Sequence, residues 1–151
     1  MTVEDPPGCE FCDVLAGRAE GSPTVFSDEW TVVTIGRRQP TGAGYCLVVL
    51  RHHVADLAEL PDAELVGLWR TVGLVQWAIR VAFGPSGTTV MVNDGPPGQP
   101  VGHLHVHVVP RWTGDGYPCS AGNDESADAL LIQADRLRSV LQAAFEELSR
   151  G

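Results

Sequence analysis

The chain has 151 residues and is acidic, with 10 Lys and Arg against 19 Asp and Glu and a formal net charge of -9 at pH 7. This balance argues against a general nucleic-acid surface, because backbone binding needs clustered Lys and Arg. An apolar fraction of 44% is typical of a globular protein, and no run reaches the ~18 apolar residues that a membrane span needs. The acidic, Pro-rich start MTVEDPPGCEFC is unlike a secretory signal, so we expect one cytoplasmic domain.

The N-terminal third predicts one short helix and three strands. The segment FCDVLAGRAEGS (11–22) is typical of a short helix that ends at a glycine. Residues 24–26 and 30–35 predict two strands with a turn between them, and the apolar run 45–50 predicts a strand buried on both faces. The intervening segment RRQPTGAG (37–44) is a loop by composition.

The rest of the chain predicts two long helices and two strands. After Pro61, apolar residues recur at helical spacing as far as Gly84, which predicts the main amphipathic helix with Trp69 on its core-facing stripe. Residues 88–92 predict a strand, 93–102 a Gly/Pro-rich loop and 103–110 another strand. A second apolar stripe between residues 130 and 148, which includes Phe145 and Leu148, predicts a C-terminal helix. Because strands and helices do not alternate one for one, we expect an α+β fold with a mostly antiparallel sheet.

The segment GHLHVHVVP (102–110) places His103, His105 and His107 at alternate positions. Alternate side chains of a strand share one face, so we expect three imidazoles roughly 6.5 to 7 Å apart opposite an apolar face. Imidazole can act as nucleophile, proton-transfer group or metal ligand. The preceding loop could cradle an anion with its backbone N–H groups. This combination favours phosphoryl or nucleotidyl transfer over the alternative, an ordinary partly exposed strand.

Cys9 and Cys12 form a Cys-x-x-Cys pair. In a reducing compartment such a pair is more often metal-binding or redox-active than a structural disulfide. The spacing alone leaves both interpretations open.

HLHVHVV resembles the histidine triad (HIT) motif, His-φ-His-φ-His-φ-φ with φ apolar. The blocks that extend the resemblance cover about residues 9–117 of a single HIT domain (1–151), with a helical extension at about 125–149. The resemblance implies a HIT-like fold: a five-stranded antiparallel sheet with a long amphipathic helix, a short N-terminal helix and an added C-terminal helix. Members usually form homodimers in which two sheets join edge to edge.

The family resemblance also implies an activity. Members hydrolyse or transfer nucleoside monophosphate groups from phosphoramidates, dinucleoside polyphosphates and other nucleotidyl conjugates. Some relatives with a similar HVVPRW continuation are dinucleoside polyphosphate phosphorylases. A third alternative is a nucleotide-binding regulatory protein that has lost turnover. In each case the expected partner is a nucleotide or nucleotidyl conjugate, with neither nucleic acid nor membrane.

Family roles transfer to matching positions. His105, the middle residue of the triad with His103, would attack the α-phosphorus and form a covalent nucleotidyl-histidine. His107 would contact phosphate oxygens or help to move protons. Asn93 lies where the family has a phosphate-binding amide, and Gln99 where it has a glutamine on the leaving-group side.

In zinc-containing members the resemblance gives four metal ligands, which correspond here to Cys9, Cys12, His53 and His103. His52 is the neighbouring alternative to His53. A closed Cys2His2 site is structural rather than catalytic. Such a zinc would clamp the N-terminal segment against the histidine strand.

Several positions depart from the family pattern. Pro100 replaces a Ser or Thr and offers neither a hydroxyl nor a backbone N–H. Tyr45 replaces a histidine. Arg37 falls where Asp or Asn accepts the ribose hydroxyls, so either the ribose is held differently, or an extra anionic group meets Arg37 or Arg38, or both arginines are solvated. Trp30 opens a strand near the expected nucleoside pocket and could stack on a base.

Overall fold

Five strands form one antiparallel sheet in this computed structural model, which describes residues 6–119, 122–148 and 150. The side chains of Phe145 and Leu148 lie outside the described part, and so does their predicted place on the C-terminal stripe. The spatial order is β1-β2-β4-β6-β5, and every pairing is antiparallel. The strands are β1 (Thr24–Ser27), β2 (Thr31–Ile35), β4 (Cys46–Leu50), β6 (His105–Arg111) and β5 (Gly87–Val92). The α+β class and the five-stranded antiparallel sheet are therefore confirmed.

A second sheet has two strands, and one of them lies inside the segment 37–44 that the sequence predicted as loop. β3 (Arg38–Gln39) pairs with β7 (Asn123–Asp124), and the Arg38 guanidinium donates to the Asp124 carboxylate. The loop prediction is wrong at these two residues. Its physical reason is that the partner strand lies 86 positions further along the chain, so local composition carries no sign of it.

Three α-helices and one 3-10 turn complete the fold. They are α1 (Glu10–Leu15), η1 (Leu57–Glu59), α2 (Asp62–Phe83) and α3 (Ala127–Leu148). α2 ends at Gly84, whose φ of 65° is left-handed and suits a residue without Cβ. α3 begins before the predicted apolar stripe, because the Ser126 hydroxyl accepts from the Ala129 backbone N–H and caps the first, solvent-facing turn.

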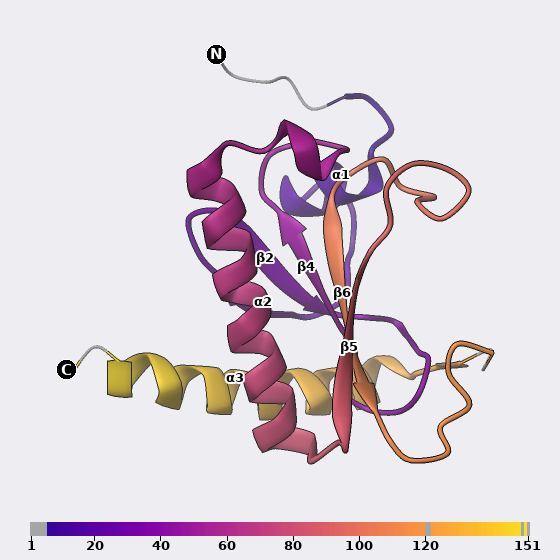
Figure 1. Cartoon of the computed structure of the whole chain (residues 1–151), viewed down its shortest axis with the longest axis vertical. Coiled ribbons are helices and arrows are strands. Elements are labelled where there is room, and N and C mark those ends of the chain that lie inside the picture. The colour runs from indigo at the N-terminus through magenta and orange to yellow at the C-terminus, as the bar shows by residue number, and fades with distance from the viewer. Residues whose placement is uncertain (1–5, 120–121, 149, 151) are drawn as a thin grey trace.

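The main core lies between α2, α3 and one face of the sheet. Figure 1 shows α2 running alongside the strands and α3 crossing the far end of the sheet from α1. The inward side chains alternate along β4 and β6 with those of the opposite face. They include Val48, Leu50, Val106, Val108, Leu68, Ile79, Ala134 and Leu137.

Trp69 is not part of this core. Leu68, Val72 and Val75 fill the sheet-facing side of α2, and Trp69 lies about 100° further round the helix than Leu68, with 41% of its surface exposed. The prediction that Trp69 is a core residue is therefore wrong. None of the helices among the described residues combines the length and apolar character of a membrane span.

Candidate active site and metal centre

The face of the sheet opposite the core carries the histidines. β6 itself begins at His105, so only His105 and His107 belong to the strand, and their ring centroids lie 4.8 Å apart. His103 precedes the strand in a bend, where its backbone N–H bonds to the Val101 carbonyl at 2.8 Å. The expectation of three equally spaced imidazoles on one strand is corrected accordingly: two face the open side, and His103 turns toward the cysteines.

His105 has one ring nitrogen committed to the backbone. Its Nδ1 lies 2.7 Å from the His103 carbonyl oxygen. A carbonyl only accepts, so Nδ1 carries the proton and Nε2 keeps its lone pair. Burial lowers the pKa of His105, and the Phe11 ring covers it at a centroid distance of 4.9 Å. The site therefore presents a neutral imidazole with a free lone pair.

His107 is held at both ring nitrogens. The Tyr45 hydroxyl lies 2.6 Å from Nδ1, and the Asn93 amide nitrogen lies 3.3 Å from Nε2. Burial lowers the pKa of His107 to about 4 and raises the pKa of Tyr45, so a neutral ring faces a protonated phenol. A Cβ at Gly36 would lie 2.2 Å from the Tyr45 ring, so glycine is needed there for the tyrosine to reach His107.

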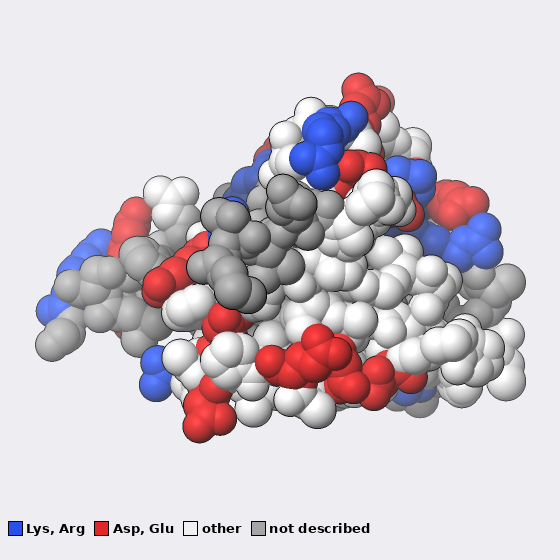
Figure 2. Space-filling model, turned by 90° about the horizontal axis from the view of Figure 1, so that it is seen from above, with Lys and Arg blue, Asp and Glu red and all other residues white. Residues whose placement is uncertain are grey.

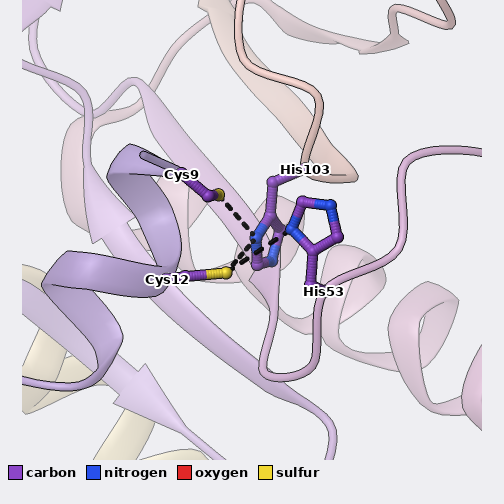
Figure 3. Close-up of side chains that lie close together, drawn as sticks. All are labelled: Cys9, Cys12, His53 and His103. Atoms are coloured by element: carbon purple, nitrogen blue, oxygen red, sulfur yellow. Dashed lines mark hydrogen bonds between the residues drawn. The ribbon is translucent and has the colours of Figure 1, made fainter. Parts of the chain in front are cut away.

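Cys9, Cys12, His53 and His103 converge from three separate segments, with all four ligand atoms within 4.8 Å of one another. Figure 3 shows both sulfur atoms, from the start of α1, directed at the imidazoles. The Sγ to Nδ1 separations are 3.4 Å for Cys9 to His103, 3.4 Å for Cys12 to His103 and 3.5 Å for Cys12 to His53. Zn–S and Zn–N bonds of about 2.3 and 2.0 Å in a tetrahedron place neighbouring ligands about 3.5 Å apart. The donor set and its spacing therefore fit zinc.

His103 is prepared for this role by a second contact. Its Nε2 lies 2.8 Å from the Leu50 carbonyl, which fixes the proton there and leaves Nδ1 to face the sulfur atoms. His52, the alternative ligand, instead pairs with Glu64 of α2 at 2.9 Å. The structure thus places His53 in the cluster and His52 outside it.

Two other predicted residues lie elsewhere. The Gln99 side chain accepts from the Gly95 N–H at 2.9 Å and donates to the Ala55 carbonyl at 3.0 Å. It therefore connects the 93–102 loop to the segment that contains Ala55. Trp30 packs on α2, where a Cβ at Gly67 would lie 2.4 Å from its ring. Trp30 does not line the described cavity beside His107.

A cavity of about 390 Å³ opens beside His107. Its walls include Arg37, Tyr45, Met91 and Tyr117. The Arg111 guanidinium stacks on the Tyr117 ring at 4.6 Å and is bound by Asp115, which anchors the loop after β6. Sequence reasoning missed Tyr117 and Phe11 as site residues, because neither carries a motif of its own.

Comparisons with known proteins agree with this arrangement. The HIT domain family model matches residues 18–114. "Protein hit" of Bacillus subtilis is 33% identical over 111 residues, which cover 72% of this chain and 75% of that protein. A zinc-bound histidine triad family protein from Mycobacterium smegmatis superposes with a TM-score of 0.77 at 27% identity, covering 93% of this chain and 97% of that one. An adenylylsulfatase of Arabidopsis thaliana is 28% identical over 106 residues, or 68% of this chain and 52% of that protein.

The fold and the paired histidines define a histidine triad protein. The chain belongs to the HIT family.

Proposed function

We propose that the protein is a nucleotidyl hydrolase or transferase that cleaves a nucleoside monophosphate from a nucleotidyl conjugate through a covalent intermediate on His105. Candidate conjugates are phosphoramidates, dinucleoside polyphosphates and mixed anhydrides such as adenylyl sulfate. The observation that carries this proposal is the 2.7 Å contact between His105 Nδ1 and the His103 carbonyl, which fixes the nucleophilic tautomer.

In the proposed reaction, Nε2 of His105 forms a bond to the α-phosphorus while the bond from phosphorus to the leaving group breaks. The leaving group takes its proton from solvent or through His107. Water then attacks the same phosphorus, the N–P bond breaks, and the monophosphate leaves with His105 neutral again. The Asn93 amide and backbone N–H groups of the 93–102 loop would stabilise the charge on the phosphate oxygens, at roughly 3 to 4 kcal/mol for each well-aimed donor.

Two alternatives use the same site. With phosphate as the acceptor in place of water, the product is a nucleoside diphosphate and the enzyme is a phosphorylase. A nucleotide-binding regulatory protein without turnover is favoured by Pro100, which lacks a backbone N–H to offer the phosphate.

The test is to trap the adduct. The protein is mixed with adenylyl sulfate, adenosine phosphoramidate or diadenosine tetraphosphate, quenched in acid-free denaturant and analysed by intact mass. We expect an adenylyl adduct in the wild type and in the control His52→Ala, and none in His105→Ala. Omission or addition of phosphate separates hydrolase from phosphorylase by the product. Absence of any adduct and any turnover in the wild type would leave the regulatory alternative.

We further propose a structural zinc held by Cys9, Cys12, His53 and His103. Bound to these four ligands, the ion would link the start of α1 to the segment before β6. No ligand position remains for substrate, so the ion orients the site rather than joining the reaction. None of the four described cysteines forms a disulfide, which fits the proposal of a reducing, cytoplasmic location.

We also propose a homodimer built on α2. Val66, Trp69, Trp77 and Val81 are 41 to 57% exposed and share one face of the helix. Gly73 lies at the middle of this stripe, and a Cβ there would meet nothing within 4 Å. The stripe is self-complementary: an antiparallel copy places Trp69 opposite Trp77 on either side of Gly73. β5, at the edge of the sheet, offers a free edge to the same partner.

The oligomeric state tests this interface. We expect wild type and Ile132→Glu, a control at an exposed apolar position of α3, to elute as dimers with light scattering. Trp77→Glu should elute as a folded monomer. A dimeric Trp77→Glu variant would contradict the proposed interface. We propose that α3 belongs to the same single domain (1–151), because its buried side chains join the core beneath β1 and β2.

A further inference from the structure

Arg37 occupies the junction of two cavities. It lines the cavity beside His107, and it also lines a neighbouring cavity of about 230 Å³ whose apolar walls are Phe11, Val14 and Leu47. Leu47 is likewise common to both cavities. The two spaces are therefore adjacent, and Arg37 is part of the wall of each.

The cavity beside His107 is locally positive in an acidic protein. Arg37 and Arg38 are among its lining residues, and none of its described lining residues is Asp or Glu. Figure 2 shows one face, where acidic and basic side chains both lie around a largely uncharged centre. A cavity with two arginines therefore stands apart from the overall charge of -9.

The two arginines differ in what they bind. Arg38 is engaged with Asp124 of β7 through two N–H to oxygen contacts of 3.1 and 3.2 Å. The Arg37 backbone is held by the Glu125 N–H, which donates to its carbonyl at 3.2 Å. Within the described ranges, the Arg37 side chain makes no ion pair or side-chain hydrogen bond. The Arg37 backbone is therefore held in place, while its side chain is available to bind a ligand.

The order of the surfaces matches the order of parts in a nucleotide. The reacting phosphorus belongs at His105 and His107, and the apolar cavity under Phe11 and Val14 accepts a flat base. The ribose then lies between them, beside Arg37. A guanidinium has five donors, no acceptor and a permanent charge, and it matches a phosphate in a two-point contact better than a neutral hydroxyl.

We propose that Arg37 makes the protein selective for nucleotides whose ribose carries a second phosphate on the 2′ or 3′ oxygen. This inference rests on the proposed function for the place of the reacting phosphorus. Glu10 and Glu20 also line the second cavity, and their charges disfavour a phosphate beside them.

Matched ligand pairs test the inference. In calorimetry, wild type should bind adenosine 3′,5′-bisphosphate or its 2′,5′ isomer more tightly than AMP, by on the order of 10- to 100-fold. Turnover of 3′-phosphoadenylyl sulfate should exceed that of adenylyl sulfate in kcat/KM by a similar factor. Arg37→Gln should bring the affinity ratio between bisphosphate and AMP, and the kcat/KM ratio between the two conjugates, close to one. Arg37→Lys should restore part of the preference, because the charge returns without the fork geometry.

Arg38→Gln is the matched control, because Arg38 lines the same cavity but its guanidinium is bound to Asp124. That variant should keep the preference. Equal affinity of wild type for AMP and both bisphosphates, or an unchanged preference in Arg37→Gln, would overturn the inference. A wild type that discriminates in binding but forms no adduct and turns over neither conjugate would retain the inference and refute the proposed catalysis, so the two failures are distinct.

Discussion

The two faces of β6 are built from the same strand by opposite means. Val106 and Val108 face the core, are fully buried and pack in the apolar cluster that α2 covers. His105 and His107 face the other way and are held by directed contacts to a carbonyl, a phenol and an amide. The first face derives its stability from removal of apolar surface from water, and the second from a few polar contacts and a metal-type cluster.

The comparison shows how one sheet can be stable and reactive at once. The apolar face is stabilised by many weak contacts, so that the loss of any single contact changes its stability little. The histidine face depends on single contacts, each of which fixes a tautomer or an orientation. Changes to the apolar side chains and changes to the polar contacts of His107 should therefore separate loss of stability from loss of chemistry.

Removal of the proposed zinc should have the largest effect. A chelator should cost about 4 kcal/mol or more of the free energy of unfolding, because a tightly bound ion stabilises only the folded state. Thermal melting with zinc or with chelator measures the difference, and elemental analysis gives one zinc per chain. Cys12→Ser should lose the chelator response, and Cys119→Ser, at an exposed cysteine, should keep it. Purified protein without zinc, with a melting point that chelators leave unchanged, would refute the metal centre.

A substitution that creates a cavity in the apolar core should have the second-largest effect on stability. Leu137→Ala should cost about 3 kcal/mol, since this fully packed side chain of α3 leaves a void that neighbours only partly fill. Urea unfolding measures the loss, and Leu131→Ala on the exposed side of the same helix should cost little. The amount of adduct per folded molecule should match wild type. A selective loss of adduct in Leu137→Ala would show that the two faces are not independent.

Tyr45→Phe should reverse that pattern. Loss of the hydroxyl frees Nδ1 of His107 and should lower kcat/KM about tenfold, with a stability change of only about 1 kcal/mol. Tyr117→Phe is the control in the same cavity, since the hydrogen bond of its hydroxyl within the described part of the chain is to the Met91 sulfur, at 3.8 Å. Activity of Tyr45→Phe equal to wild type would mean that Asn93 alone orients the ring.

The acid side of the stability profile carries the smallest effect. Burial lowers the pKa of His107 from 6.5 to about 4, so well above pH 6.5 the ring is neutral in the folded and in the unfolded chain and adds no pH dependence to the stability. As the pH falls from 6.5 toward 4, the unfolded chain takes up this proton before the folded one, and stability declines. With allowance for solvent screening of a half-buried ring, we expect under about 1 kcal/mol at pH 6. Melting temperatures of wild type and His107→Gln, measured between pH 6.5 and 4, should show a steeper decline with falling pH in the wild type. An identical pH dependence of the two melting temperatures would contradict this prediction.

Local pattern was sufficient for much of the fold. The apolar periodicity predicted α2 and α3, a continuous apolar run predicted β4, and alternation predicted β6. Gly84 marked the end of α2. All of these signals depend on neighbours within a few positions. The Cys-x-x-Cys pair indicated a metal or redox site and the alternating histidines indicated phosphoryl or nucleotidyl transfer, whereas the full set of candidate metal ligands needed the family resemblance.

Tertiary structure decided which of these residues meet. It turned His103 out of the strand toward Cys9 and Cys12, chose His53 over His52, and brought Tyr45 to His107. It also left Trp69 outside the core and paired β3 with β7. Sequence periodicity reports which side of an element is apolar, whereas these contacts join positions tens of residues apart. Their geometry is set only when the sheet, α1 and the loops pack together.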